Sequence, residues 1–265
     1  MSGHAISCSF VVSLKALKQR IMHTTKQRTA LITGASRGLG FALAEALAQK
    51  GWHLLINGRN AQKLLAAQRI LQQYTTVEAI SGDVMDEIHL IQFPERLQQL
   101  PPLELVVNNA STLGASPQPH LMDYTIESIH HIFHTNVIAP LSLLQKVRPF
   151  LSPKAQIINI SSDAAVQAYA GWGGYGASKA ALDQLTAILA EENPDWKVYA
   201  LDPGDMRTQM HQEAFPEQDL SDLPLPVEQA VPALLRLIQH PWRSGRYTLG
   251  QLEVMGVAEA QALLK

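Results

Sequence analysis

Short apolar runs alternate with segments of helical periodicity along most of this chain. The runs have the length of buried strands and lie at 29–32, 53–57, 77–81, 103–107, 157–160 and 197–201, with a shorter one at about 246–249. Successive parallel strands need a crossover between them, and that crossover is usually a helix. The alternation therefore predicts an α/β fold, a doubly wound parallel sheet with helices on both faces, in a single domain.

The composition excludes several classes of protein. The chain has 265 residues, of which 46% are hydrophobic and 17% charged, and its formal net charge is -2. The apolar runs are shorter than the roughly 18 residues that a membrane helix needs, so no membrane partner is expected. A near-neutral charge argues against nucleic acid as a partner. Because Cys8 is the single cysteine, no intrachain disulfide is expected and a reducing, cytoplasmic location is favoured.

The first 28 residues differ from the rest of the chain. They are basic and lack acidic residues, with Lys15, Lys18, Arg20, Lys26 and Arg28. A segment of this kind is compatible with an organelle-targeting peptide. The competing interpretation takes Met22 as the working start and the upstream residues as an extension without a role. In both cases we expect residues 1–28 to be an N-terminal extension and 29–265 to form the folded domain.

A glycine-rich turn joins the first strand to the first helix. The glycines have the spacing Gly34-x-x-x-Gly38-x-Gly40. Glycines in a strand–turn–helix context allow the backbone to approach a pyrophosphate, which then lies at the helix N-terminus. The turn therefore predicts a dinucleotide site that also includes Ser36 and Leu39.

The end of the second strand bears on the choice of dinucleotide. An acidic residue there binds the ribose 2′-hydroxyl of NAD(H), whereas arginine accommodates the 2′-phosphate of NADP(H). The chain has no acid at this point and carries Arg59, with Arg37 in the glycine-rich turn. The pattern favours NADP(H) over NAD(H); the alternative is that both arginines are solvated surface residues.

Tyr175 and Lys179 are spaced four residues apart on a predicted helix, so their side chains share one face. An ammonium group one turn from a phenol favours the phenolate, and we therefore expect Lys179 to lower the pKa of Tyr175. Ser162 follows the fifth strand and could hydrogen-bond a substrate carbonyl. The alternative is an ordinary surface tyrosine and lysine on a helix.

Other segments carry weaker signals. A helix over 86–99 is expected to be interrupted at Pro94, and a long one over 126–151 to bend at Pro140. A further helix is expected over 227–239. Residues 205–226 have the length and composition of a substrate loop, and the aromatic and methionine residues near the site indicate an apolar or aromatic substrate. His130 and His134 have a metal-binding spacing, but without further ligands we predict no metal site.

Taken together, these motifs are similar to those of the short-chain dehydrogenase/reductase family of the classical type, over residues 29–249. Thr33–Gly40 resembles its cofactor loop, and Asn108-Asn109-Ala110-Ser111 its Asn-Asn-Ala-Gly motif with serine at the last position. Asn136 lies where the family has a helix asparagine. Ser162, Tyr175 and Lys179 match its catalytic Ser…Tyr-x-x-x-Lys, and Pro203-Gly204 with Met206 and Thr208 resembles its nicotinamide loop. Asp205 and a helical tail at 251–265 depart from the family pattern.

The resemblance implies a Rossmann-type fold and an NADP(H)-dependent carbonyl reductase or alcohol dehydrogenase. Tyr175 would exchange the proton, Ser162 would stabilise the oxygen, and Lys179 would bind the nicotinamide ribose. Asn136 would hold a water linking Lys179 to solvent. The cofactor contacts implied are Arg37, Arg59, Asp83 and Val84 at the adenosine half, Asn109 and Ala110 in the central crevice, and Pro203, Gly204, Met206 and Thr208 at the nicotinamide.

The resemblance also implies a small-molecule substrate and a homodimer or homotetramer. Two other functions stay open from the sequence. One is a cofactor-binding sensor or scaffold with little turnover, and the other is an isomerase or epimerase that retains its NAD(P).

Overall fold

The computed structural model describes residues 27–240 and 242–254. Its centre is a sheet of seven parallel strands in the order β3-β2-β1-β4-β5-β6-β7. The strands are β1 (Thr29–Ile32), β2 (His53–Gly58), β3 (Val77–Ser81), β4 (Leu103–Asn108), β5 (Leu151–Ile160), β6 (Lys197–Asp202) and β7 (Gly245–Thr248). The predicted doubly wound, Rossmann-type sheet is therefore confirmed.

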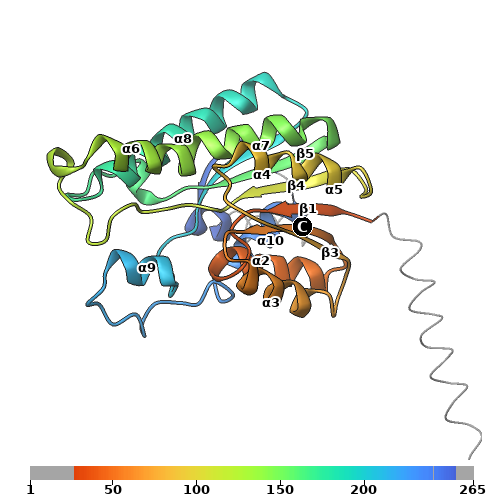
Figure 1. Cartoon of the computed structure of the whole chain (residues 1–265), viewed down its shortest axis with the longest axis horizontal. Helices are drawn as coiled ribbons and strands as arrows, with labels where there is room; N and C mark the ends of the chain where they lie inside the picture. Colours follow the sequence, from red (N-terminus) through yellow and green to blue (C-terminus); the bar gives the residue numbers. More distant parts are fainter. Residues whose placement is uncertain (1–26, 241, 255–265) are drawn as a thin grey trace, which may run out of the picture.

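Helices cover both faces of the sheet (Figure 1). One face packs against α2 (Gly38–Gln49), α3 (Ala61–Leu71) and α10 (Ala230–Gln239). The other carries α4 (Glu87–Leu90), α5 (Gln92–Leu97), α6 (Ile126–Phe133), α7 (Ala139–Val147) and α8 (Gly173–Glu192). The short helix α9 (Gln209–Ala214) lies apart from both layers.

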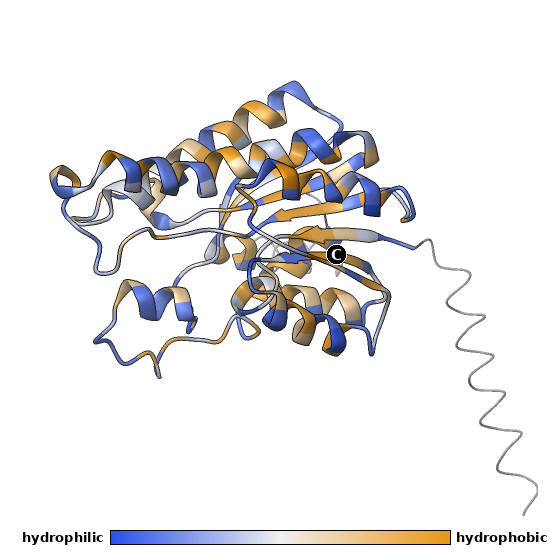
Figure 2. Cartoon of the chain, in the orientation of Figure 1, coloured by the Kyte–Doolittle hydropathy of each residue, from blue (hydrophilic) through white to orange (hydrophobic). Residues whose placement is uncertain are grey.

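Strands β1 to β6 each contribute to two cores because successive side chains point to opposite faces. In β1, Ala30 and Ile32 belong to the core under α2, whereas Leu31 belongs to the core under α5 and α7. Burial on both faces explains why the strands are continuous apolar runs rather than alternating ones; Figure 2 shows them as a hydrophobic layer between the helices.

The strand register places the loop segments of the site at one edge of the sheet. Ile32 pairs with Ile56 of β2 and with Val107 of β4, and Val107 pairs with Ile158 of β5. The central strands therefore end at nearly the same level. The residues that follow each strand meet there, as expected for ligand sites in open α/β sheets.

The helices on the second face are interrupted at positions other than the prolines that the sequence pattern indicated. The expected helix over 86–99 is two helices that meet at Ile91, and Pro94 lies inside the first turn of α5, where it has no helical hydrogen bond to lose. The long helix is interrupted by a π-helix, η2 (His134–Ile138), and Pro140 sits in the first turn of α7.

Three smaller differences between the predicted and the observed elements affect the site. Residues 209–214 form α9 rather than irregular loop, because the Thr208 hydroxyl caps it by accepting from the His211 backbone N–H at 3.2 Å. Gly173 and Gly174 belong to α8. Strand β5 begins at Leu151, well before the apolar run that predicted it.

The terminal predictions lie mostly outside the described residues. Residues 249–254 are helical, which agrees with the start of the expected tail, while 255–265 and the segment 1–26, with Cys8, are not described. Within 27–240 and 242–254, no helix has the length and apolar character needed to cross a membrane.

Candidate active site

The segments that follow the strands enclose a cavity of about 360 Å³. It brings together most of the site residues predicted from the sequence: Gly34, Ser36, Arg37, Gly38, Leu39, Arg59, Asp83, Val84, Asn109, Ala110, Ser162, Tyr175, Lys179, Pro203, Gly204, Met206 and Thr208. Gly40 and Asn136 do not line the cavity but support its wall.

Tyr175 and Lys179 lie in the first two turns of α8, and both are buried, at 7% and 2% exposure. The Lys179 Nζ donates a hydrogen bond of 2.7 Å to the carbonyl of Ile160, at the end of β5. It lies 5.5 Å from the centroid of the Tyr175 ring. The predicted pairing of the two side chains on one helix face is therefore present, with Lys179 anchored to the neighbouring strand.

Burial governs the protonation of this pair. It raises the pKa of Tyr175 and lowers the pKa of Lys179 to about 8, because each charged form loses its contact with water. Hydrogen bonding with the side chains of Ser162 and Ser111 lowers the pKa of Tyr175, but its effect is smaller than that of burial. The lower Tyr175 pKa expected from the sequence is therefore not found, because burial raises this pKa overall.

Ser162 lies just beyond β5, before the short helix η4 (Asp163–Ala165). Its hydroxyl donates to Asp163 Oδ1 at 2.9 Å and accepts from the Ala164 backbone N–H at 3.2 Å. The Tyr169 hydroxyl donates to the other carboxylate oxygen of Asp163 at 2.6 Å. Although burial raises the pKa of Asp163, these hydrogen bonds lower it overall, so a carboxylate lies beside the Ser162 hydroxyl.

The side-chain amide of Asn136, in the π-helix, makes four hydrogen bonds to other residues of the protein. Its oxygen accepts from the Ser111 hydroxyl at 3.0 Å and the Thr112 N–H at 2.9 Å. Its nitrogen donates to the Thr112 carbonyl and the Ser178 hydroxyl, both at 2.9 Å. Ser178 in turn donates to the Tyr175 carbonyl at 2.6 Å. The amide thus fixes the loop after β4 against α8, and the expected water would have to bind elsewhere than on this amide.

The glycine-rich turn is built for close approach of backbone. Gly34 and Gly38 have φ values of 65° and 58°, which favour glycine. The Thr33 hydroxyl accepts from the backbone N–H groups of Asn109 and Ala110, each at 3.0 Å. A Cβ on Gly40 would lie 2.5 Å from Asn109 Nδ2, so Gly40 lets α2 pack tightly beneath the turn.

The two arginines, Arg37 and Arg59, line the cavity and are exposed, at 44% and 62% of their side chains. Arg37 lies 3.8 Å from Glu213 of α9, and Arg59 lies 4.0 Å from Asp83. Lys63 also lines the cavity and was missed. The signal was available, because Lys63 lies four residues after Arg59, in the first turn of α3, which the Asn60 side chain caps by accepting from the Lys63 backbone N–H at 2.9 Å.

Next to Tyr175, the cavity is lined by the aromatic side chain of Trp172. The ring of Trp172 lies 5.7 Å from Tyr175 and 5.7 Å from Phe215, measured between centroids. Met210 and Ala214, on α9, pack with Trp172 against a small core that includes Leu113. Leu113, Asp163 and Ala214 were not predicted as site residues, since they come together only through the loops after β4, β5 and β6.

Comparison with known proteins assigns the family. The sequence model of the short chain dehydrogenase family matches residues 28–219. The chain belongs to the short-chain dehydrogenase/reductase family. This makes the protein an oxidoreductase of the kind that binds a nicotinamide cofactor and acts on small molecules.

Relatives of this short-chain dehydrogenase/reductase cover most of its length. An uncharacterized oxidoreductase of Staphylococcus epidermidis is 31% identical over 195 residues, spanning 71% of this chain and 82% of the relative. Sepiapterin reductase of Rattus norvegicus is 34% identical over 205 residues, spanning 69% and 76%. A short-chain dehydrogenase of Escherichia coli CFT073, solved in complex with NADPH, has a TM-score of 0.77 and 26% identity, covering 86% of this chain and 98% of that one.

One further residue of this short-chain dehydrogenase/reductase belongs to the site. Ser111, which replaces the family's glycine, places a hydroxyl between Asn136 and the Tyr175 phenol.

The three histidines His130, His131 and His134 are exposed. Among residues 27–240 and 242–254, no group of three or more His, Cys, Asp or Glu side chains is placed to hold a metal ion.

Proposed function

We propose that this enzyme binds NADP(H) and reduces a carbonyl compound to an alcohol, or catalyses the reverse oxidation. The observation that carries the proposal is that Ser162, Tyr175 and Lys179 meet the glycine-rich turn in one cavity. The NADPH complex of the E. coli structure supports the choice of cofactor.

The residues present fit a dinucleotide. No side chain caps the N-terminus of α2, so its first N–H groups can bind the diphosphate. A Cβ on Gly34 would come within 2.8 Å of Asn109 Nδ2, so only glycine keeps this cradle open. Its other contacts would be Ser36, Gly38, Leu39, Asp83, Val84, Asn109, Ala110, Pro203, Gly204, Met206 and Thr208.

The choice of NADP(H) depends on the basic end of the cavity. Arg37 and Arg59 would bind the 2′-phosphate, with Lys63 adding a third positive charge. Guanidinium groups bind phosphate through paired hydrogen bonds. Each arginine now faces a carboxylate, at 3.8 Å and 4.0 Å; such exposed pairs are weak and would yield to a phosphate.

The protein's own groups account for the acid–base chemistry. When bound, the reduced nicotinamide supplies a hydride to the carbonyl carbon. Tyr175 donates its phenolic proton to the carbonyl oxygen. Ser162 turns its hydroxyl from Asp163 to the same oxygen and stabilises the negative charge that develops there. Lys179 has two donors beyond the one given to Ile160 and would bind the ribose hydroxyls.

The walls of the substrate end indicate the kind of carbonyl compound. Trp172, Met210 and Leu113 form an apolar surface next to Tyr175, and the Phe215 ring packs on Trp172. We therefore propose an apolar or aromatic substrate, with residues 205–226 as the loop that contacts it. A panel of aromatic, aliphatic and polyhydroxylated carbonyl compounds tests this, and a preference for the polyhydroxylated compounds would contradict it.

We also propose a homodimer or homotetramer. Apolar side chains are exposed on the outer helices, with Ile138 at 47%, Leu141 at 36% and Ile188 at 42% exposure. A second copy would remove them from water. Light scattering at micromolar concentration tests this: we expect the mass of a dimer or tetramer, and the mass of a monomer would contradict the proposal.

The decisive experiment is a fluorescence titration with NADPH and NADH. We expect tighter binding of NADPH in the wild type and loss of this preference in Arg37→Ala/Arg59→Ala. A carbonyl panel then follows, with Tyr175→Phe as the inactive control. Equal or tighter NADH binding would overturn the arginine assignment. NADPH binding without turnover of any compound would favour a sensor over an enzyme.

A further inference from the structure

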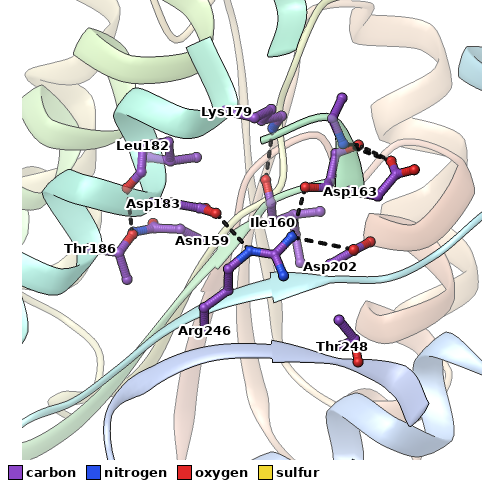
Figure 3. A network of polar contacts seen from close by, with 12 residues as sticks. Asn159, Ile160, Asp163, Lys179, Leu182, Asp183, Thr186, Asp202, Arg246 and Thr248 are labelled. Atoms are coloured by element: carbon purple, nitrogen blue, oxygen red, sulfur yellow. Dashed lines mark hydrogen bonds and ion pairs between the residues drawn. The ribbon is translucent and has the colours of Figure 1, made fainter. Parts of the chain in front are cut away.

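Arg246 connects three segments of the site, although it lies on the edge strand β7 and was not singled out from the sequence. Its Nε donates to Asp183 Oδ2 at 2.9 Å. Its NH2 group donates to the Ser162 backbone carbonyl at 2.9 Å and to Asp202 Oδ2 at 3.4 Å. Figure 3 shows the Arg246 side chain extending from β7 between Asp183 and Asp202.

Each partner belongs to a segment that carries a functional group. Asp183 lies one helical turn after Lys179 on α8. Asp202 ends β6 directly before Pro203-Gly204, and its Oδ1 accepts from the Gly204 N–H at 3.0 Å. Ser162 carries the hydroxyl proposed to contact the substrate. The guanidinium therefore holds the ends of β5 and β6 and the middle of α8 in one arrangement.

The direction of the Arg246 side chain follows from strand alternation. Its neighbour Tyr247 points to the opposite face, where its ring lies 6.0 Å from Tyr199 and 5.8 Å from Trp242. Arg246 points instead to the face covered by α8. Only 25% of its side chain is exposed, and Asp183 and Asp202 are 14% and 10% exposed, so the ion pairs are better shielded than surface pairs.

Arg246 also balances charge near the proton donor. The charged groups that face Tyr175 are Asp202 from β6, Asp163 from η4 and Lys179 from its own helix. Both carboxylates favour the neutral phenol. The positive charge of Arg246 partly cancels the negative charge of Asp202. It also partly cancels the negative charge of Asp183, the carboxylate that stabilises the charged form of Lys179.

We propose that Arg246 is a positioning residue for the reaction: it fixes Ser162 and the Asp202–Gly204 turn against α8, and it offsets the negative charge of Asp202 beside Tyr175. This inference rests on the proposed function, because it needs a measurable turnover. It assigns a role to the last strand of the sheet, which otherwise contributes nothing to the cavity wall.

The test compares Arg246→Met with Arg246→Lys and with Arg243→Met. Arg243 is an exposed arginine three residues earlier, so its variant removes the same charge without touching the three partners. Steady-state kcat, the Kd for NADPH, thermal unfolding and the pH profile of kcat are measured for each. Asp202→Asn is added for the pH profile.

We expect Arg246→Met to lower kcat by about 10- to 100-fold, as for a displacement of catalytic groups by up to an ångström. The Kd for NADPH should change by less than about 3-fold, since Arg37 and Arg59 are proposed to supply most of the charge contacts with it. The limb of the pH profile that reports Tyr175 should move to higher pH in Arg246→Met and to lower pH in Asp202→Asn. Arg246→Lys should keep the wild-type pH profile and lose kcat, because lysine lacks the planar fork.

Different outcomes separate the two proposals. A wild type that binds no NADPH or reduces no carbonyl compound overturns the proposed function before any variant is compared. With an active wild type, Arg246→Met matching Arg243→Met in kcat overturns the role of Arg246. So does a loss of kcat with an unchanged pH profile and a lower unfolding temperature, which is the signature of scaffolding alone. If Arg246→Met does not fold, Arg246→Lys decides: a reduced kcat at unchanged unfolding temperature supports the role, and an unchanged kcat overturns it.

Discussion

Gly176→Ala should damage catalysis more than stability. Gly176 follows Tyr175 on α8, at the point where the helix touches the loop after β5. A Cβ at this position would lie 2.7 Å from the carbonyl oxygen of Ala164. An ordinary contact of this kind is about 3.4 Å, so helix and loop must separate by roughly 0.7 Å. Since Tyr175 is on one side of this contact and Ser162 on the other, the separation acts directly on their geometry.

The magnitudes can be weighed against each other. Overpacking of this size costs about 1–3 kcal/mol, whereas replacing glycine by alanine inside a helix favours folding by about 1 kcal/mol. The net loss of unfolding free energy is therefore about 0–2 kcal/mol. A displacement approaching 1 Å between catalytic groups lowers the rate by up to about 100-fold. We expect kcat to fall by at least about 10-fold.

The assay is NADPH-dependent carbonyl reduction, together with thermal unfolding and a titration with NADPH. Ala180→Gly is the matched control, because Ala180 is exposed on the same helix and its loss should cost about 1 kcal/mol without moving Tyr175. If Gly176→Ala kept kcat within about 3-fold of the control while its unfolding temperature dropped by several degrees, the contact with Ala164 would be structural only, and the reasoning would be refuted.

Three further predictions concern the fold that supports the site. Asn136→Ala should lower the unfolding free energy by more than about 2 kcal/mol in urea titrations, because it removes four hydrogen bonds, including both that the amide makes with the Thr112 backbone; a loss below about 0.5 kcal/mol would contradict the hydrogen-bond network. Leu43→Ala should lower the unfolding free energy by about 2–5 kcal/mol, since Leu43 is 1% exposed in the core under α2. A smaller loss measured by calorimetry would show that the core collapses around the cavity. Burial lowers the pKa of His89, so its contribution to stability is present above the unfolded-state value of about 6.5 and is lost as the pH falls; His89→Gln should flatten this acid limb of urea unfolding, and an unchanged limb would exclude His89 as its source.

Much of the fold could be predicted because its signals are local. The strands are apolar runs, and the turn after β1 is recognisable from its glycines. The interruptions of the helices could not be predicted in the same way. Asn136 lies in a π-helix where a continuous helix was expected, and what fixes this backbone is a set of contacts with Ser111, Thr112 and Ser178, two of which come from a loop far away in the sequence.

The site shows the same division. Motif residues such as Tyr175 and Lys179 were predicted because their spacing is a local property. Arg246 was not, since its three partners lie 44 to 84 residues away in the sequence. A single arginine in a short edge strand gives no local sign of such contacts. Lys63 is intermediate, because its helix could be predicted, but that it lines the same cavity as Arg37 and Arg59 required the fold.

The electrostatics of Tyr175 could be derived only from the fold, and they bear on the direction of the reaction. Spacing on a helix indicates an ammonium group near a phenol, but it does not reveal that both groups are buried. Burial opposes charge on each of them, and it raises the pKa of Tyr175 despite the nearby lysine. Reduction of a carbonyl needs a protonated tyrosine, whereas oxidation of an alcohol needs the phenolate to take up a proton. With Tyr175 as the proposed proton donor, we therefore expect reduction to proceed at neutral pH and oxidation by the same residues to require a more alkaline solution.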